Sequence, residues 1–359
     1  MHKFWSGLAA PLILRIQYLQ DWEPLSHQQK QAASAVEVFR ITEETVDQLF
    51  QMGHLVDITH LQALLSIIFH TLDAYLKKLV SQLVDMQDLY PPVPSLTRYN
   101  ETAFPILKRK LAEAAVLDDG VYNKLNQLTI SKLCVRLNTL QYIQRQMTTL
   151  KDGIRKSWST IRVFADTICS EGKSPEHSNG NSDMCDESTD ELFAATFDCI
   201  RDSATNAIRI TSELLGARVV FWDLRESFVF HLYHSSVEGA RLESVLPQFD
   251  NILNNICGLI DDALRDFVVS RIYKSSLEGY IWVLLDGGPS RAFSNSDVAM
   301  MEEDLGMLKD LFVADGEGLP RSLVTEEAKA AQQIISLFSL QLDMASIRAA
   351  LGTWVMPRL

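Results

Sequence analysis

The chain has 359 residues, of which 47% are hydrophobic and 22% are charged, so it can bury a sizeable core and cover it with polar surface. This composition excludes disorder as the main state. The formal net charge of -13 argues against a large nucleic-acid interface, because phosphate contacts need a basic protein face. Only 16 Gly and 11 Pro occur, which is few for the tight turns of a β-sandwich or barrel and argues against an all-β fold. From the length we expect two helical units.

The cysteines and the apolar runs indicate a cytosolic protein. Five cysteines are scattered without a C-x-x-C pair, which is typical of a reducing compartment and of a chain without a disulfide framework or a zinc site. The apolar stretch from Leu8 to Leu14 is far shorter than the ~20 residues that span a bilayer. No small-residue cleavage site follows it, so we expect neither a signal peptide nor a membrane span. The cysteines are Cys134, Cys169, Cys185, Cys199 and Cys257.

The first predicted helix follows a capping pattern near the N-terminus. Ser26 and Gln29 have the spacing of a capping box, in which a hydroxyl and an amide side chain satisfy the free backbone N–H groups of a helix start. Between Ala32 and Phe50, apolar residues then return every three or four positions, as one buried helix face requires.

The second predicted helix has the clearest apolar stripe in the chain. Thr59 and Gln62 predict its start, and leucines and isoleucines continue the stripe to Leu83. Tyr90-Pro91-Pro92 is expected to stop it. At 1.5 Å per residue such a helix is ~40 Å long, which favours an elongated bundle over a compact globule.

A third helix is predicted to begin near Ser131 and to bury a stripe that reaches Leu150. The composition then changes abruptly, because residues 170–189 contain no aromatic or branched apolar side chain. Such a segment cannot bury enough surface to order itself. We predict a flexible acidic linker over residues 169–190, which separates two helical units.

Beyond this linker the helical pattern resumes. A stripe from Phe193 to Leu215 predicts a helix, and Gly216 is the expected C-cap, since glycine accommodates the left-handed conformation there. Val219–Trp222 is the best strand-like run of the chain, but it has no partner run and therefore predicts no sheet.

Three further helix boundaries are predicted in the C-terminal part. Pro247 fits the first turn of a helix that begins near Leu246, since proline needs no N–H partner there. The dense apolar run Ile281–Leu285 is expected to end a helix before Asp286-Gly287-Gly288-Pro289. Ser294 with Asp297 predicts the cap of the next helix.

No pattern in the sequence predicts an active site. His231 and His234 stand three residues apart, a spacing that suits two ligands of one metal, but no further ligand lies at a supporting distance, and we interpret them as surface histidines. Residues 286–291 lack the Gly-Lys-Ser/Thr ending of a Walker loop and are interpreted as a turn. No nucleophile elbow or H-E-x-x-H motif occurs. We predict no catalytic residue, no cofactor and no metal.

Each of two short stretches can be interpreted either as a binding site or as a purely structural segment. Lys108-Arg109-Lys110 is the densest basic cluster, and a solvated turn is favoured over a binding patch. Tyr90–Pro94 is compatible with a polyproline ligand, but a rigid connector after the long helix is the favoured interpretation.

Several long stretches carry a family resemblance. The chain is similar to the plant branch of the MUN-domain family, whose members resemble the uncoordinated-thirteen exocytosis factors of animals and include the type of protein named for proton ATPase translocation control. The matching stretches are AVEVFRITEETVDQ at 35–48, DMQDLYPPVP at 85–94, KLCVRLNTL at 132–140, FWDLR at 221–225 and LLDGGPSR at 284–291.

This resemblance implies an all-α rod of elongated, stacked helical bundles, related to vesicle-tethering complexes. It implies a non-enzymatic factor that promotes exocytosis or delivers membrane proteins to the plasma membrane by binding SNARE proteins or tethering-complex subunits, with plasma-membrane transporters as cargo. The implied location is cytoplasmic, with peripheral contact at the plasma membrane or endosomal vesicles. Residues 1–168 would be the C-terminal part of the first Munc homology region and residues 191–344 the second, with 345–359 unassigned.

A second reading is a structural helical scaffold or assembly subunit without SNARE activity, including a truncated, inactive copy. A large symmetric self-interface would favour this scaffold. An exposed apolar groove would favour the trafficking factor. The sequence assigns no individual partner-binding residue to either.

Overall fold

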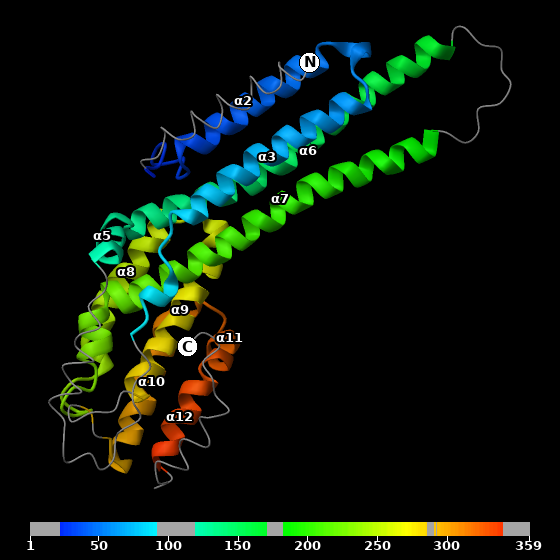
Figure 1. Cartoon of the computed structure of the whole chain (residues 1–359). Coiled ribbons are helices and arrows are strands. Elements are labelled where there is room, and N and C mark those ends of the chain that lie inside the picture. Colours follow the sequence, from blue (N-terminus) through cyan, green and yellow to red (C-terminus); the bar gives the residue numbers. More distant parts are fainter. Residues whose placement is uncertain (1–21, 92–118, 171–181, 286–290, 292, 340–359) are drawn as a thin grey trace. The chain divides into compact units, whose positions relative to one another are not determined.

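The computed structural model describes residues 22–91, 119–170, 182–285, 291 and 293–339, and nearly all of its regular structure is helical (Figure 1). Within these ranges no β-strand occurs, and Pro24 and Ala32 form one isolated bridge. The predicted all-α class is thus confirmed. The chain divides into two compact units, residues 1–83 with 132–211 (unit 1) and residues 84–131 with 212–359 (unit 2).

In the part of unit 1 that the structure describes, four helices bury their apolar stripes against one another (Figure 1): α2 (Ala33–Phe50), α3 (Ile58–Ser81), α6 (Ile130–Ser170) and α7 (Ser182–Arg218). Side-chain contacts join α2 to α3 and to α6, and α6 to α7. Ser34 shares a hydrogen bond with the Tyr75 hydroxyl, the Phe39 and Tyr142 rings meet edge to face, and Gln144 donates to Thr205. Helix α7 contributes its residues up to Thr211 to unit 1.

The two predicted capping boxes of unit 1 are wrong in their positions. The Gln29 N–H does donate to Ser26 Oγ at 3.0 Å, but this closes an exposed turn, because α2 begins only at Ala33. The N-cap of α3 is Asp57, whose carboxylate accepts the His60 N–H at 3.0 Å. Aspartate is a better N-cap than threonine. The helix therefore begins at Ile58, directly after Asp57, and not after the predicted cap Thr59. The helix also ends earlier than predicted, at Ser81.

The Asp57 cap predicts an unusual acid titration. The hydroxyl of Thr59 donates to its carboxylate at 2.6 Å, and together with the His60 N–H this holds the pKa of Asp57 at about 2, below the ordinary 3.8. The folded pKa is depressed, so the stabilisation is present above pH 3.8 and is lost as pH falls toward 2. We expect Thr59→Val to raise the pKa of Asp57 in an NMR titration of the carboxyl carbon. Thr45→Val, which removes a hydroxyl bonded to the Ile41 carbonyl in α2, should leave that pKa unchanged.

The segment between the two predicted units is partly helical. Helix α6 continues to Ser170 and α7 begins at Ser182, inside the range 169–190 that the composition assigns to a linker. Residues 171–181 lie outside the described part of the chain. Each compact unit combines two separate stretches of sequence, whereas the sequence-based division places one boundary at the linker.

Unit 2 packs short helices around α9 (Asp262–Leu285), which is buried on nearly every side over its second half. This packing explains the dense apolar run Ile281–Leu285, because a helix surrounded by other helices needs no polar face. The predicted positions of Pro247 in the first turn of α8 and of the Ser294–Asp297 capping box are confirmed. The other helices are α5 (Asp119–Gln127), α8 (Leu246–Leu259), α10 (Val298–Val313), α11 (Arg321–Glu327) and α12 (Lys329–Ser339).

The strand-like run Val219–Trp222 is part of a π-helix, η3 (Val219–Asp223), and a second one, η4 (Arg225–Phe230), follows it. Of the side chains that suggested a strand, Val219, Val220 and Phe221 are instead buried in the core of unit 2. Gly279 of α9 lets this segment approach, since a Cβ there would lie 2.6 Å from Val220 Cγ1 and 2.9 Å from Phe228 Cε1. Tertiary packing has therefore overridden the local strand preference.

One buried arginine, Arg291, and one buried aspartate, Asp304, organise the polar interior of unit 2. Arg291 is 3% exposed and donates to the carbonyl oxygens of Val229 and Phe230, at the end of η4, and of Leu232 just beyond it. Asp304, with no exposed surface, accepts hydrogen bonds from the Tyr233 hydroxyl at 2.8 Å and from Arg241 Nε at 2.7 Å. These contacts hold α10 against the chain that follows η4.

Candidate interaction groove

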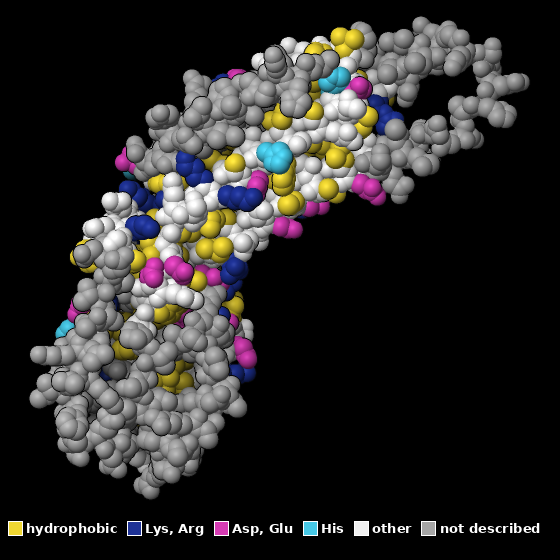
Figure 2. Space-filling model, viewed as in Figure 1, with side chains coloured by type: hydrophobic (Ala, Val, Ile, Leu, Met, Phe, Trp, Pro, Cys, Tyr) yellow, Lys and Arg dark blue, Asp and Glu magenta, His cyan; other side chains and the backbone are white. Residues whose placement is uncertain are grey.

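An apolar groove of about 290 Å³ lies between α3 and α7 in unit 1, and we call it the α3–α7 groove. Each helix lines it with four side chains at positions i, i+3, i+4 and i+7, which share one face of a helix. In Figure 2, hydrophobic side chains are visible along the described surface of α3 and α7 among polar ones. The lining residues are Gln62, Leu65, Ser66 and Phe69 of α3 and Leu192, Ala195, Thr196 and Cys199 of α7.

The groove exists because small side chains alternate with large ones along its walls. Phe69 and Leu192 are half-buried, whereas Ser66 and Ala195 are exposed and leave space between them. The core of unit 1 occupies the neighbouring face of each helix, with Ile68 and Phe197 almost fully buried. Leu65, 1% exposed, belongs to that core and forms the floor of the groove, and Phe69, Leu192, Ala195 and Cys199 form its more accessible apolar surface.

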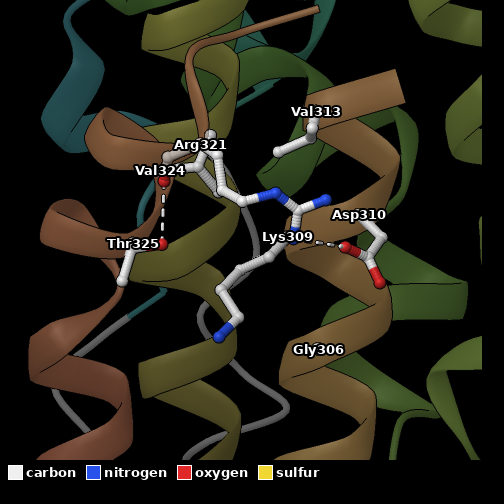
Figure 3. Close-up of a pocket in the computed structure, with 7 residues that line it drawn as sticks. All are labelled: Gly306, Lys309, Asp310, Val313, Arg321, Val324 and Thr325. Carbon is white, nitrogen blue, oxygen red and sulfur yellow. Dashed lines mark hydrogen bonds and ion pairs between the residues drawn. The ribbon is translucent and has the colours of Figure 1, made fainter. Parts of the chain in front are cut away.

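A second hollow, of about 220 Å³, lies in unit 2 between α10 and α11 (Figure 3). The Arg321 side chain extends across it toward Asp310, with 3.6 Å between Nη1 and Oδ1, and the Thr325 hydroxyl donates to the Arg321 carbonyl. Both members of this ion pair are more than 70% exposed, so water screens them and the pair holds little binding energy. The larger apolar groove is the better candidate. The remaining lining residues are Gly306, Lys309, Val313 and Val324.

The histidine pair singled out in the sequence lies on the surface of unit 2. Both His231 and His234 are exposed, with ring centroids 6.4 Å apart, and His231 Nδ1 lies within hydrogen-bond reach of the Glu226 carbonyl. In the part of the chain that the structure describes, no group of three or more His, Cys, Asp or Glu side chains is placed to hold a metal ion.

The other stretches weighed in the sequence have structural roles or lie outside the described residues. Tyr90 donates its hydroxyl to Glu278 and packs on the Phe221 ring, as a connector would. Arg291, at the end of the glycine-rich stretch, faces protein carbonyl groups. Lys108-Arg109-Lys110, the prolines at 92 and 94 and residues 286–290 are outside the described part.

The position of Cys199 in the groove predicts a reactive thiol. Cys199 is exposed, whereas Cys134 is fully buried, and burial raises the pKa of the Cys257 thiol. Because the thiolate is the reactive form, we expect N-ethylmaleimide to modify Cys199 before Cys257 and Cys134 in the native protein. Peptide-resolved mass spectrometry after short exposures checks this order, and equal rates for Cys199 and Cys134 would show that α7 does not present this face to solvent.

None of the described helices is both long enough and apolar enough to cross a membrane.

Comparison with known proteins identifies the family of the chain. Residues 9–347 match the family described as PATROL1-like, TPR repeats. The chain is 34% identical over 320 residues to a protein of Arabidopsis thaliana named "Protein unc-13 homolog", which covers 89% of this chain and 28% of that relative. It thus spans about 28% of the relative's length, and the match extends over both compact units. The chain belongs to the PATROL1-like family of unc-13-related plant proteins.

Proposed function

We propose that this chain is a non-enzymatic vesicle-trafficking factor, which promotes exocytosis or the delivery of membrane proteins to the plasma membrane by binding SNARE proteins or tethering-complex subunits. The relative named as an unc-13 homolog supports the trafficking role. The observation that carries the binding role is the exposed apolar groove between α3 and α7, since helix-lined grooves of this kind receive partner segments.

The proposal includes where the chain works and how it is divided. It works in the cytoplasm, in peripheral contact with the plasma membrane or endosomal vesicles that carry transporter cargo. Residues 1–168 and 191–344 correspond to the end of the first and to the second Munc homology region. Long helices such as α3 and α7 supply the extended surfaces on which partners assemble.

The test is affinity purification of the tagged chain from plant cells, read by quantitative mass spectrometry. We expect the unaltered chain to enrich SNARE proteins or tethering-complex subunits. Ala195→Lys places a charge in the α3–α7 groove and should abolish that enrichment. Ala299→Lys makes the same change at another exposed helical alanine, in α10 of unit 2, and should preserve it.

Other outcomes would overturn the proposal. If the unaltered chain enriches no SNARE protein and no tethering subunit, the trafficking role of this chain is wrong. Recovery of the chain alone, together with a dimer or larger species in sedimentation velocity, would instead support the structural scaffold.

A further inference from the structure

The α3–α7 groove has the geometry of a site for a single helix. Its walls are residues 62–69 and 192–199, each of which spans about 10 Å along its helix, or two turns. An extended peptide would need backbone hydrogen-bond partners, but the backbone groups of α3 and α7 in these stretches are used within their own helices. A helix satisfies its own backbone groups and can present apolar side chains at i, i+3 or i+4, and i+7. The groove therefore favours a helical occupant.

One rim of this groove is acidic. Glu191, Asp198 and Asp202 follow one another at spacings of seven and four residues, so they form one stripe on α7, next to the stripe of Leu192, Ala195 and Cys199. Asp198 has one ion pair, with Arg201 at 3.0 Å, and Glu191 and Asp202 are exposed carboxylates. We call Glu191, Asp198 and Asp202 the acidic rim.

The α3 rim has no such excess of charge. Asp73 and Lys77 form an ion pair at 2.8 Å, with Lys77 exposed to water, and His70 is exposed beside Phe69. The two rims differ, so an occupant that carries basic residues on one flank would be held in one orientation, with that flank along α7. A second copy of the chain, with its net charge of -13, is a poor source of such a helix.

From these features we propose that the α3–α7 groove binds a basic amphipathic helix of a partner protein, with its apolar ridge between the two helices and its Lys or Arg side chains against the acidic rim. This proposal rests on the proposed function, whose binding site it describes more closely. It names the chemistry of the partner segment, a short helix of about two to three turns with apolar residues on one face and basic residues beside them.

The test uses three synthetic peptides of about 18 residues, long enough for several helical turns. The first has a leucine ridge at helical spacing and lysine on its flank, the second replaces the lysines by glutamate, and the third has the composition of the first in scrambled order. Binding of each to the full chain is measured by fluorescence anisotropy near 0.15 M salt, where exposed charges farther apart than ~8 Å are screened. We expect the lysine peptide to bind on the order of tenfold more tightly than the glutamate and scrambled peptides.

Substitutions in the chain test whether the preference for the lysine peptide arises in the groove. Glu191→Lys with Asp202→Lys should remove or reverse the preference for lysine over glutamate peptides. The matched control, Glu238→Lys with Glu302→Lys, changes the net charge by the same amount at exposed positions of unit 2 and should leave it intact. Ala195→Trp fills the groove and should weaken both helical peptides. Bound lysine peptide should also slow the alkylation of Cys199 in the unaltered chain.

Several results would overturn the proposal. Equal binding of the lysine and scrambled peptides would show that charge attraction alone, without an apolar helical ridge, explains the binding. An unchanged alkylation rate of Cys199 at saturating peptide would show that the peptide binds outside the groove. Equal loss of affinity in the charge-reversed pair and its matched control would indicate a general charge effect. If the peptides behave as expected but SNARE proteins and tethers are not enriched from cells, the helix site stands and the trafficking role fails. If those proteins are enriched from cells but the peptides do not bind, the trafficking role stands and the helix site fails.

Discussion

Replacement of Asp304 by alanine is expected to destabilise unit 2 by about 1–3 kcal/mol, the usual cost of leaving buried hydrogen-bond donors without their acceptor. Asp304 has no exposed surface, and its carboxylate accepts hydrogen bonds from Tyr233 and Arg241. The substitution would leave the Tyr233 hydroxyl, the Arg241 guanidinium and the nearby Leu242 N–H with fewer acceptors. Burial and the neighbouring Tyr280 and Asp304 raise the pKa of Tyr233 far above its ordinary value, so Tyr233 remains a neutral donor at every physiological pH.

The measurement is native-state hydrogen exchange, resolved by mass spectrometry over peptides of α9 and α10, because these helices report on unit 2 by itself. The matched control is Glu303→Ala. Glu303 contacts the same Arg241 at 2.9 Å, but its side chain is 67% exposed, and we expect a loss below about 1 kcal/mol. If both variants lose protection equally, the buried network does not stabilise this unit.

Replacement of Gly216 by leucine is expected to destabilise unit 2 by about 1–3 kcal/mol, because extra atoms in a closely packed contact force the backbone apart. Gly216 lies inside α7, where a Cβ would stand 2.7 Å from the Arg271 carbonyl oxygen and 2.8 Å from Ser275 Oγ of α9. The clash with Arg271 involves backbone, so a rotamer change cannot relieve it. It outweighs the gain in helix propensity, roughly 1 kcal/mol, that leucine brings.

The matched control for Gly216 is Gly258→Leu in α8. Gly258 is also helical, but it is exposed and nothing lies within 4 Å of the position of its Cβ. Leucine there should leave stability unchanged or raise it by up to about 1 kcal/mol. Urea denaturation followed by circular dichroism compares the two variants, and a stable Gly216→Leu protein would show that α7 and α9 are not in close contact at this point.

Gly216 also shows where sequence reasoning failed. A glycine after a long apolar stripe is the usual sign of a helix C-cap, and the stripe from Phe193 to Leu215 made that reading reasonable. The helix instead continues to Arg218, and Gly216 allows α7 to lie close to Arg271 of α9, about 55 residues later in the chain. Nothing near Gly216 in the sequence indicates that contact.

The α3–α7 groove was missed for the same reason. Its two walls lie more than 100 residues apart, and each contains ordinary helical residues such as Ser66 and Ala195. The heptad-like spacing on each helix could have been found in the sequence. That the two stripes face one another, and that the acidic rim lies beside them, required the packing of unit 1.

The sequence by itself determined the helical class, the first-turn position of Pro247 and the cap formed by Ser294 and Asp297, because apolar periodicity and capping act over a few neighbouring residues. The resemblance in its long motifs indicated the plant unc-13-related family. Tertiary structure alone decided that Val219–Trp222 is helical, that each compact unit joins two distant stretches and that an apolar groove remains open. These features depend on which helices pack together, and that choice is made by the burial of surfaces far apart in the chain.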